Sequence, residues 1–160
     1  MNRLPYLACA GGVFVVDRLS KRAVGRALDE GAATTVIPGF FDLVHWHNRG
    51  VAFGLFSESD SGAKVVFLSL VAMLAIGGVL VYSFRNPPEH RLLQVGLALI
   101  LGGALGNLVD RIAMGYVVDF LYFYLGPYSW PAFNAADSAI TVGVGALALL
   151  VIQDEVRNRA

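Results

Sequence analysis

The chain has 160 residues, of which 56% are hydrophobic and only 15% are charged, and its mean hydropathy is +0.62. This composition is too apolar for an ordinary soluble domain and predicts that the lipid bilayer is the solvent. Twelve basic and twelve acidic residues give a formal net charge of zero, so no overall positive field exists to attract nucleic acid. We therefore expect membrane lipid as a partner, and no nucleic acid.

The first apolar stretch, residues 4–16, has the length of a signal-peptide core. It continues without proline into DRLSKRAVGRAL, which can extend a helix, so we interpret residues 4–27 as a retained membrane span. Small residues at positions 8 and 10–12 leave cleavage after this run as the alternative.

The second stretch, residues 65–84, contains no charged side chain. At about 1.5 Å per residue it is long enough to cross a hydrocarbon core of about 30 Å. The third stretch, residues 92–111, carries four glycines, at positions 96, 102, 103 and 106, which allow another helix to approach closely. We expect this span to be packed among the others and not to face lipid.

The fourth stretch covers residues 134–153 and begins with Asn134 and Asp137. Four spans place both termini on one side of the membrane and both longer connections, residues 28–64 and 112–133, on the other. The basic residues do not settle which side is which. Five of them lie on the side of the termini and seven on the opposite side.

The two connections differ in character. Residues 34–56 are rich in β-branched and aromatic residues around a Pro38-Gly39 turn, which predicts a small β platform at the membrane surface. Residues 112–133 hold many tyrosine, phenylalanine and tryptophan side chains, which favours an interfacial aromatic loop. The expected fold is a mainly α membrane protein, a four-transmembrane-helix bundle forming a single domain over residues 1–160.

Two aspartates are the strongest candidates for chemistry. Asp119 in VVDF and Asp137 in FNAAD have apolar neighbours and no adjacent basic residue. Carboxylates near hydrocarbon are costly, and a functional role is the default interpretation. Two like carboxylates brought together share a proton, so one titrates high and the other low. Such a pair supplies the acid and the base that amide hydrolysis needs.

The other charged residues near span ends allow structural interpretations. Asp17 and Lys21 are spaced i, i+4, which fits either a buried ion pair or an exposed pair at a helix end. Asn107 and Asp110 share a helix face at i, i+3, and helix capping with an ion pair to Arg111 would explain them.

Metal and serine chemistry have little support in the sequence. His45 and His47 alternate on one predicted strand, and two histidines are too few for a zinc site without a third ligand nearby. The serines have no base at a recognisable spacing. We expect neither a metal nor a cofactor.

Taken in order, five short motifs resemble those of one family, the bacterial lipoprotein signal peptidases, also called signal peptidase II. The motifs are DRLSK at 17–21, NRGVAF at 48–53, GNLVDR at 106–111, VVDF at 117–120 and FNAAD at 133–137. Each is weak alone, but their order on four spans is specific. The resemblance covers nearly the whole chain.

The resemblance implies a multi-pass aspartic endopeptidase of the bacterial inner membrane that acts on diacylglyceryl-modified prolipoproteins. It would remove their signal peptides on the N-terminal side of the lipidated cysteine. Both termini would be cytoplasmic, and the active site and β platform would lie at the periplasmic face. The implied catalytic pair is Asp119 and Asp137. The implied supporting or substrate-binding residues are Asp17, Lys21, Asn48, Gly50, Asn107, Asp110, Arg111 and Asn134.

The residues leave two other classes open. Intramembrane carboxylates also build proton or ion pathways, although here the acids gather at span ends on one side. A non-catalytic membrane scaffold is the other alternative. Asn48, Asn134 and Arg111 could clamp a substrate backbone, or they could only tie loops to helices.

Overall fold

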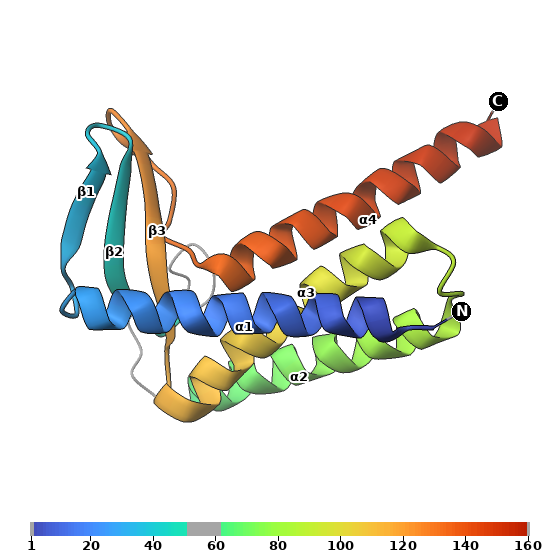
Figure 1. The fold of residues 1–160 in the computed structure, drawn as a ribbon, viewed down its shortest axis with the longest axis horizontal. Helices are drawn as coiled ribbons and strands as arrows, with labels where there is room; N and C mark the ends of the chain where they lie inside the picture. The colour runs from blue at the N-terminus through green and yellow to red at the C-terminus, as the bar shows by residue number, and fades with distance from the viewer. Residues whose placement is uncertain (1, 51–61, 160) are drawn as a thin grey trace.

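The computed structural model describes residues 2–50 and 62–159, so residues 51–56 of the predicted platform and the end of NRGVAF lie outside the described residues. It contains helices α1 (Leu4–Ala27), α2 (Gly62–Arg85), α3 (Arg91–Met114) and α4 (Ala135–Arg159), and strands β1 (Ala33–Ile37), β2 (Phe41–Asn48), β3 (Val117–Leu125) and β4 (Tyr128–Ser129). Figure 1 shows the sheet at one end of α1 and both chain termini toward the other end.

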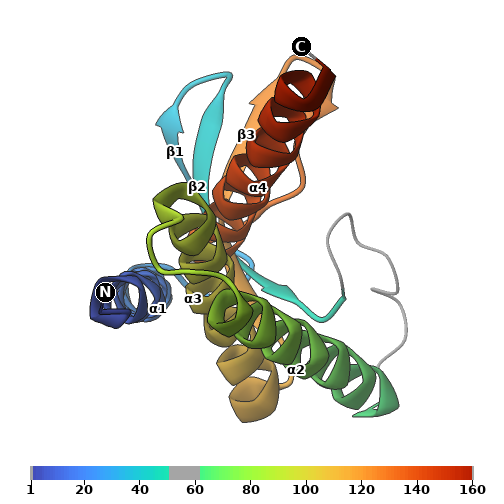
Figure 2. The same ribbon diagram turned by 90° about the vertical axis from the view of Figure 1, so that its right-hand side faces the viewer.

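Helix α3 is the centre of the helical part. It contacts α1, α2 and α4, and Figure 2 shows these three helices radiating from it. In the described part of the chain, α2, α3 and α4 are long and apolar enough to cross a membrane. The apolar window of α3 is 56% buried, against 6% for α2 and 11% for α4. The prediction of a packed third span is confirmed.

Glycines on α3 allow its neighbours to approach closely. A Cβ atom at Gly102 would lie 2.5 Å from the carbonyl oxygen of Ala10 on α1, and one at Gly106 would lie 2.5 Å from Asp17 Oδ2. Real Cβ atoms essentially never come so close, so only glycine lets α1 and its carboxylate lie against α3. The backbone of α3 therefore forms part of the wall around Asp17.

The sheet is antiparallel with strand order β1-β2-β3-β4. Its β1-β2 hairpin turns at Gly39, whose φ of 77° is in the left-handed region that glycine tolerates best. The predicted hairpin around Pro38-Gly39 is confirmed within the described residues. The prediction that residues 112–133 form a loop is wrong, because Val117–Leu125 is the strand that pairs with β2. The first four residues of this strand are all buried, so its sequence lacks the alternation of apolar and polar residues that marks a half-buried strand.

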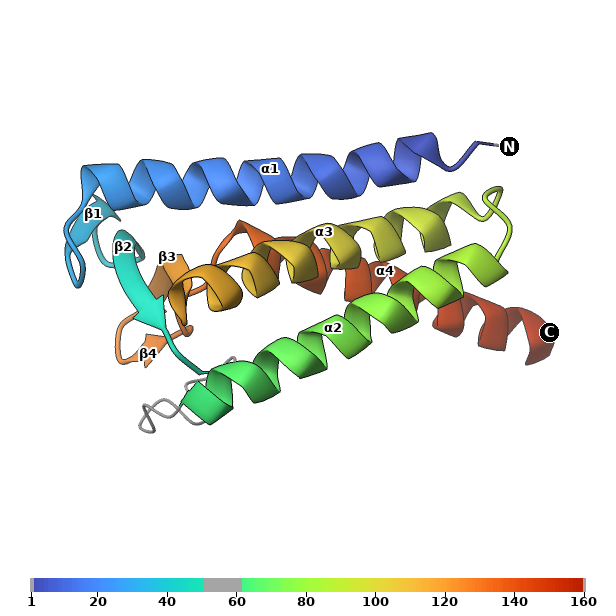
Figure 3. The same ribbon diagram turned by 90° about the horizontal axis from the view of Figure 1, so that it is seen from below.

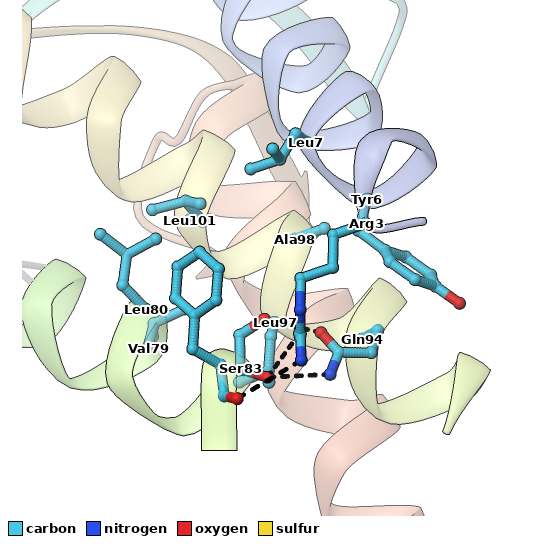
Figure 4. A pocket seen from close by; sticks show the side chains of 11 residues that line it. Arg3, Tyr6, Leu7, Val79, Leu80, Ser83, Gln94, Leu97, Ala98 and Leu101 are labelled. Atoms are coloured by element: carbon cyan, nitrogen blue, oxygen red, sulfur yellow. Dashed lines mark hydrogen bonds between the residues drawn. The ribbon is translucent and has the colours of Figure 1, made fainter. Parts of the chain in front are cut away.

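At the end of the molecule opposite the sheet (Figure 3), polar side chains cap the C-terminus of α2 (Figure 4). The Arg3 guanidinium donates to the carbonyl oxygens of Ser83 at 2.7 Å and Asn86 at 2.8 Å. Gln94, which is 1% exposed, donates to the same two oxygens and accepts from the Ser83 hydroxyl at 2.6 Å. These donors satisfy carbonyls that a helix end leaves without partners. The buried Gln94 is thus part of the cap of α2.

Replacing Gln94 by leucine keeps the volume but leaves the Ser83 hydroxyl and the α2 carbonyls with fewer partners. We expect the free energy of unfolding to fall by about 1–3 kcal/mol, the usual cost of unsatisfied buried polar groups. Thermal unfolding in detergent measures this. An unchanged unfolding temperature would show that the cap does not stabilise the helix end.

Candidate active site

Asp119 enters the site from strand β3 and is clamped by two asparagine amides. Gly115, with a φ of 79°, ends α3 and turns the chain into this strand. The Asp119 side chain is 3% exposed. Its Oδ2 accepts a hydrogen bond from Asn48 Nδ2 at 2.9 Å, and its Oδ1 accepts one from Asn134 Nδ2 at 2.7 Å. Neither bond occupies all the lone pairs of its oxygen, so each oxygen can still take a proton.

Asp137 lies in the first turn of α4 and forms a reciprocal cap with Asn134. The backbone N–H of Asn134 donates to Asp137 Oδ2 at 3.2 Å, while Asn134 Oδ1 accepts from the Asp137 N–H at 3.0 Å. This is the pattern of a capping box, in which two orphan N–H groups of a helix start are satisfied together. The second oxygen, Oδ1, accepts from Asn107 Nδ2 at 2.8 Å.

Three asparagines have their amide orientation fixed by a donor on their oxygen. Asn48 Oδ1 accepts from the N–H of Gly50 at 2.8 Å, and Asn107 Oδ1 accepts from Lys21 Nζ at 3.0 Å. Asn134 Oδ1 is held by the cap of α4. With their oxygens engaged, all three NH₂ groups must face the aspartates. Asn134 bonds to both aspartates, so it joins them into one site.

A buried ion-pair cluster lies behind Asn107. Lys21 Nζ lies 2.8 Å from Asp17 Oδ2 and 2.7 Å from Asp110 Oδ2, and all three side chains are at least 97% buried. Arg18 pairs with the other oxygen of Asp110. The buried interpretation of Asp17 and Lys21 is confirmed. Asp17 Oδ1 also accepts from the N–H of Ala136 at 3.0 Å, which ties α1 to the first turn of α4.

The expected ion pair between Asp110 and Arg111 is not the one that forms, because Asp110 points to α1 and pairs with Lys21 and Arg18. Arg111 instead donates to the carbonyl oxygens of Gly50 at 3.4 Å and Asn107 at 3.3 Å. This favours the interpretation in which Arg111 ties a loop to a helix. All the predicted site residues lie in one connected region around the two aspartates.

The environment of Asp119 favours its protonated form. Burial, and after it the negative charge of Asp137, raise the pKa of Asp119 to about 7, against the opposing effect of the Asn48 and Asn134 hydrogen bonds. A carboxyl group with such a pKa is able to donate a proton near neutral pH. The strand position, the two clamps and the neighbouring acid together define a candidate general acid.

An apolar groove of about 530 Å³ opens beside Asp137. Its polar floor includes Asn48, Asn107 and Arg111, and its walls come from the segment before α4 and from the first turns of that helix. The wall residues include Trp130, Phe133, Ile140 and Val142. In residues 2–50 and 62–159, no group of three or more histidine, cysteine, aspartate or glutamate side chains is arranged to hold a metal.

The fold and the site define a helical membrane protein with two amide-clamped carboxylates beside an apolar groove. A model of the family signal peptidase (SPase) II matches residues 9–153. The chain belongs to this family.

Curated relatives cover most of the chain. The lipoprotein signal peptidase of Azoarcus sp. (strain BH72) is 46% identical over 142 residues, covering 89% of this chain and 79% of that protein. The lipoprotein signal peptidase of Burkholderia vietnamiensis (strain G4 / LMG 22486) is 45% identical over 156 residues, covering 96% and 89%. A bacterial membrane enzyme solved by the in meso method at 2.3 Å resolution is similar in fold, with a TM-score of 0.83 and 30% identity over 94% of this chain and 89% of that one.

Proposed function

We propose that this protein is an aspartic endopeptidase that cleaves the signal peptide from diacylglyceryl-modified prolipoproteins, on the N-terminal side of the lipidated cysteine. Family membership and relatives named lipoprotein signal peptidase support this reaction. The single structural observation that carries it is Asn134, which hydrogen-bonds both Asp119 and Asp137. One amide thereby fixes the two carboxyl groups relative to each other.

In the proposed mechanism, one water molecule lies between the two aspartates. Ionised Asp137 takes a proton from the water while the water oxygen attacks the scissile carbonyl carbon. Protonated Asp119 donates its proton to the carbonyl oxygen. The tetrahedral intermediate then collapses: Asp137 passes its proton to the leaving amine, and Asp119 regains one from the intermediate. The raised pKa of Asp119 favours it as the acid. Neither a metal nor an acyl-enzyme is needed.

The apolar groove fits a substrate that stays partly in lipid. Its walls include Trp130, Phe133 and Val142, while its floor places Asn107 and Asp137 next to the chain that would enter. Acyl chains on the substrate cysteine remain in the bilayer, so the membrane itself supplies much of the binding free energy. Arg111 and Asn48 line the same groove and bind protein groups. We assign them the role of holding the site, with the substrate passing beside them.

For the membrane topology we propose four spans, with α1 as the first, in one peptidase domain over residues 1–160. The structural support is that the sheet, whose strand β3 carries Asp119, lies at one end of the bundle and the termini at the other (Figure 3). The sheet then forms a periplasmic platform beside the active site. Both termini face the cytoplasm, and the host membrane is the bacterial inner membrane.

Ion conduction is not favoured as an alternative. The buried acids Asp17 and Asp110 are both paired with Lys21, and Asp119 belongs to strand β3. The buried Gln94 is occupied as a helix cap. A relay needs polar groups throughout the depth of the bilayer. A scaffold without activity would have no use for two clamped carboxylates.

The pH dependence of the rate follows from the raised pKa of Asp119. The proposed acid must be protonated, and a pKa of about 7 means that the protonated fraction falls as the pH rises through 7. We expect kcat/KM to decline about tenfold per pH unit above this point. The apparent pKa of this decline is a property of the two coupled aspartates together. A rate that rises between pH 7 and pH 9 would contradict the assignment of the acid.

The experiment that tests the function compares a lipidated prolipoprotein with its unlipidated counterpart, each incubated with the purified protein in detergent. We expect cleavage of the lipidated substrate at the bond preceding the modified cysteine, identified by mass spectrometry. Equal cleavage of both substrates would leave a protease but reject lipid presentation. No cleavage of either by folded protein would reject the proposed function.

A further inference from the structure

A basic groove of about 400 Å³ lies where the end of α1 meets strands β2 and β3. Val118 of β3 lines this groove, whereas the residue before it, Val117, lines the groove beside Asp137. Because successive side chains of a strand point to opposite faces, the two grooves lie on opposite sides of β3. The proposed reaction makes no use of the basic groove.

The lining of this groove has an excess of positive charge. Four of its side chains are lysine or arginine, all from α1, and two are acidic. Both acids already have partners. Asp110 pairs with Lys21 and Arg18, and Glu30 Oε1 lies 2.7 Å from His47 Nδ1. The remaining positive charge of the groove therefore has to be balanced by something other than these two carboxylates.

Arg22 and Arg26 are the remaining cations of the groove. Both side chains are exposed, and within residues 2–50 and 62–159 neither guanidinium forms an ion pair or a hydrogen bond. Their i, i+4 spacing places two like charges on neighbouring turns, which is unfavourable. The dipole of α1 stabilises Arg26, which lies in the last turn of the helix, but not Arg22. The pair therefore favours an anionic ligand that both guanidinium groups contact.

The face of α1 that carries these arginines is apolar before them. Val15, Leu19, Arg22 and Arg26 follow one another at i, i+4, i+7 and i+11, so they share one helix face. Val15 is 51% exposed and Leu19 is 58% exposed. With α1 as a membrane span, as proposed above, both side chains face acyl chains. Along the helix axis, Arg22 lies about 4.5 Å and Arg26 about 10 Å beyond Leu19.

An apolar stripe that ends in two unpaired arginines matches the shape and charge of a phospholipid. Guanidinium groups bind phosphate oxygens in a bidentate geometry, and this makes arginine the preferred partner for phosphate. We propose that Arg22 and Arg26 bind the phosphate group of a negatively charged phospholipid of the periplasmic leaflet. The acyl chains of this lipid lie along Val15 and Leu19.

The position of the lipid gives it a structural consequence. Arg22 directly follows Lys21, whose ammonium group donates to Asn107 at 3.0 Å. One turn later, α1 lies against β2, where a Cβ atom at Gly25 would be 3.7 Å from the ring of His45. A lipid bound here would hold the end of α1 at the level of the phosphate groups. It would also raise the unfolding temperature by mass action.

The test is a lipid titration of the full-length protein in a non-ionic detergent free of phospholipid, followed by native mass spectrometry and thermal unfolding. The probes are dioleoylphosphatidylglycerol and dioleoylphosphatidylcholine, which have the same acyl chains and differ in net charge. We expect preferential, saturable binding of the phosphatidylglycerol and a higher unfolding temperature with it. Arg22→Gln/Arg26→Gln should weaken this binding about 25-fold, at about fivefold for each basic residue at an anionic lipid surface.

Arg157→Gln/Arg159→Gln is the matched control, because it removes two exposed arginines from the other end of the molecule, in the last turn of α4. It should bind phosphatidylglycerol as the unmodified protein does. Soluble glycerol 3-phosphate provides a further arm. It carries the phosphate without acyl chains and should protect the protein far less than the lipid does.

Three results would overturn the proposal. These are equal binding of the two lipids by the unmodified protein, unchanged binding of phosphatidylglycerol in Arg22→Gln/Arg26→Gln, and protection by glycerol 3-phosphate as strong as that by the lipid. The last would indicate a site for a soluble phosphate. No prolipoprotein is present in these measurements, so their outcome is independent of the peptidase function.

Discussion

Asp119→Asn and Asp137→Asn should each abolish cleavage of a lipidated prolipoprotein. An amide can neither deprotonate water nor donate the proton that the developing oxyanion needs. Loss of one member of an acid and base pair costs at least about 10²–10⁴-fold in rate. Single-turnover cleavage, followed by mass spectrometry, gives the size of the loss.

The pH dependence of stability tests separately whether the Asp119→Asn variant is folded. Because the folded-state pKa of Asp119 is raised to about 7, the folded protein binds a proton at this carboxyl group more tightly than the unfolded chain does. The stability that this contributes is fully present below about pH 4 and is lost as the pH rises through 7. Asp119→Asn should remove this decline while remaining inserted and helical. Retained cleavage in either variant would exclude the pair as the catalytic groups.

Lys21→Met should be the most destabilising single change in the ion-pair cluster. It removes the cation that lies 2.8 Å from Asp17 and 2.7 Å from Asp110 and leaves both buried carboxylates without it. Removing one partner of a buried ion pair costs about 3–5 kcal/mol. It also releases the oxygen of Asn107, whose amide donates to Asp137. We expect a large fall in the unfolding temperature and a lower rate in the protein that remains folded.

Arg22→Met is the matched control, because Arg22 is the next residue on the same helix but is exposed. Surface substitutions of this kind change the free energy of unfolding by about 0.5 kcal/mol or less. Equal unfolding temperatures for the two variants, measured by thermal unfolding in the same detergent, would show that the cluster does not stabilise the bundle.

Helices α2, α3 and α4 were predictable because each is a long apolar run without an interior proline. Helix α1 was predictable because its shorter apolar run continues without proline into a segment that can extend a helix. The predicted span 4–27 coincides with α1, and the spans 65–84 and 92–111 lie within α2 and α3. Strand β3 was missed for a physical reason. Residues 117–120 are buried on both faces, so their hydrophobic run does not alternate. Its aromatic continuation was read as a membrane-surface loop.

The two aspartates were predictable from their apolar surroundings, but their clamps were not. Asn48 and Asp119 are 71 residues apart, and Asn107 and Asp137 are 30 apart, so their contacts follow from tertiary packing. The pairing of Asp110 with α1 instead of its neighbour Arg111 has the same origin. One local signal was available in the sequence: Asn134 and Asp137 have the i, i+3 spacing of a capping box.

The most direct test of water activation by Asp119 and Asp137 is a single turnover of lipidated prolipoprotein in ¹⁸O-labelled water containing hydroxylamine. If two carboxylates activate water, the released signal peptide carries one ¹⁸O atom in its new carboxyl group and no hydroxamate forms. A serine such as Ser138, which also lines the groove, would instead form an acyl-enzyme that hydroxylamine traps. Hydroxamate on the released peptide would contradict direct attack by water.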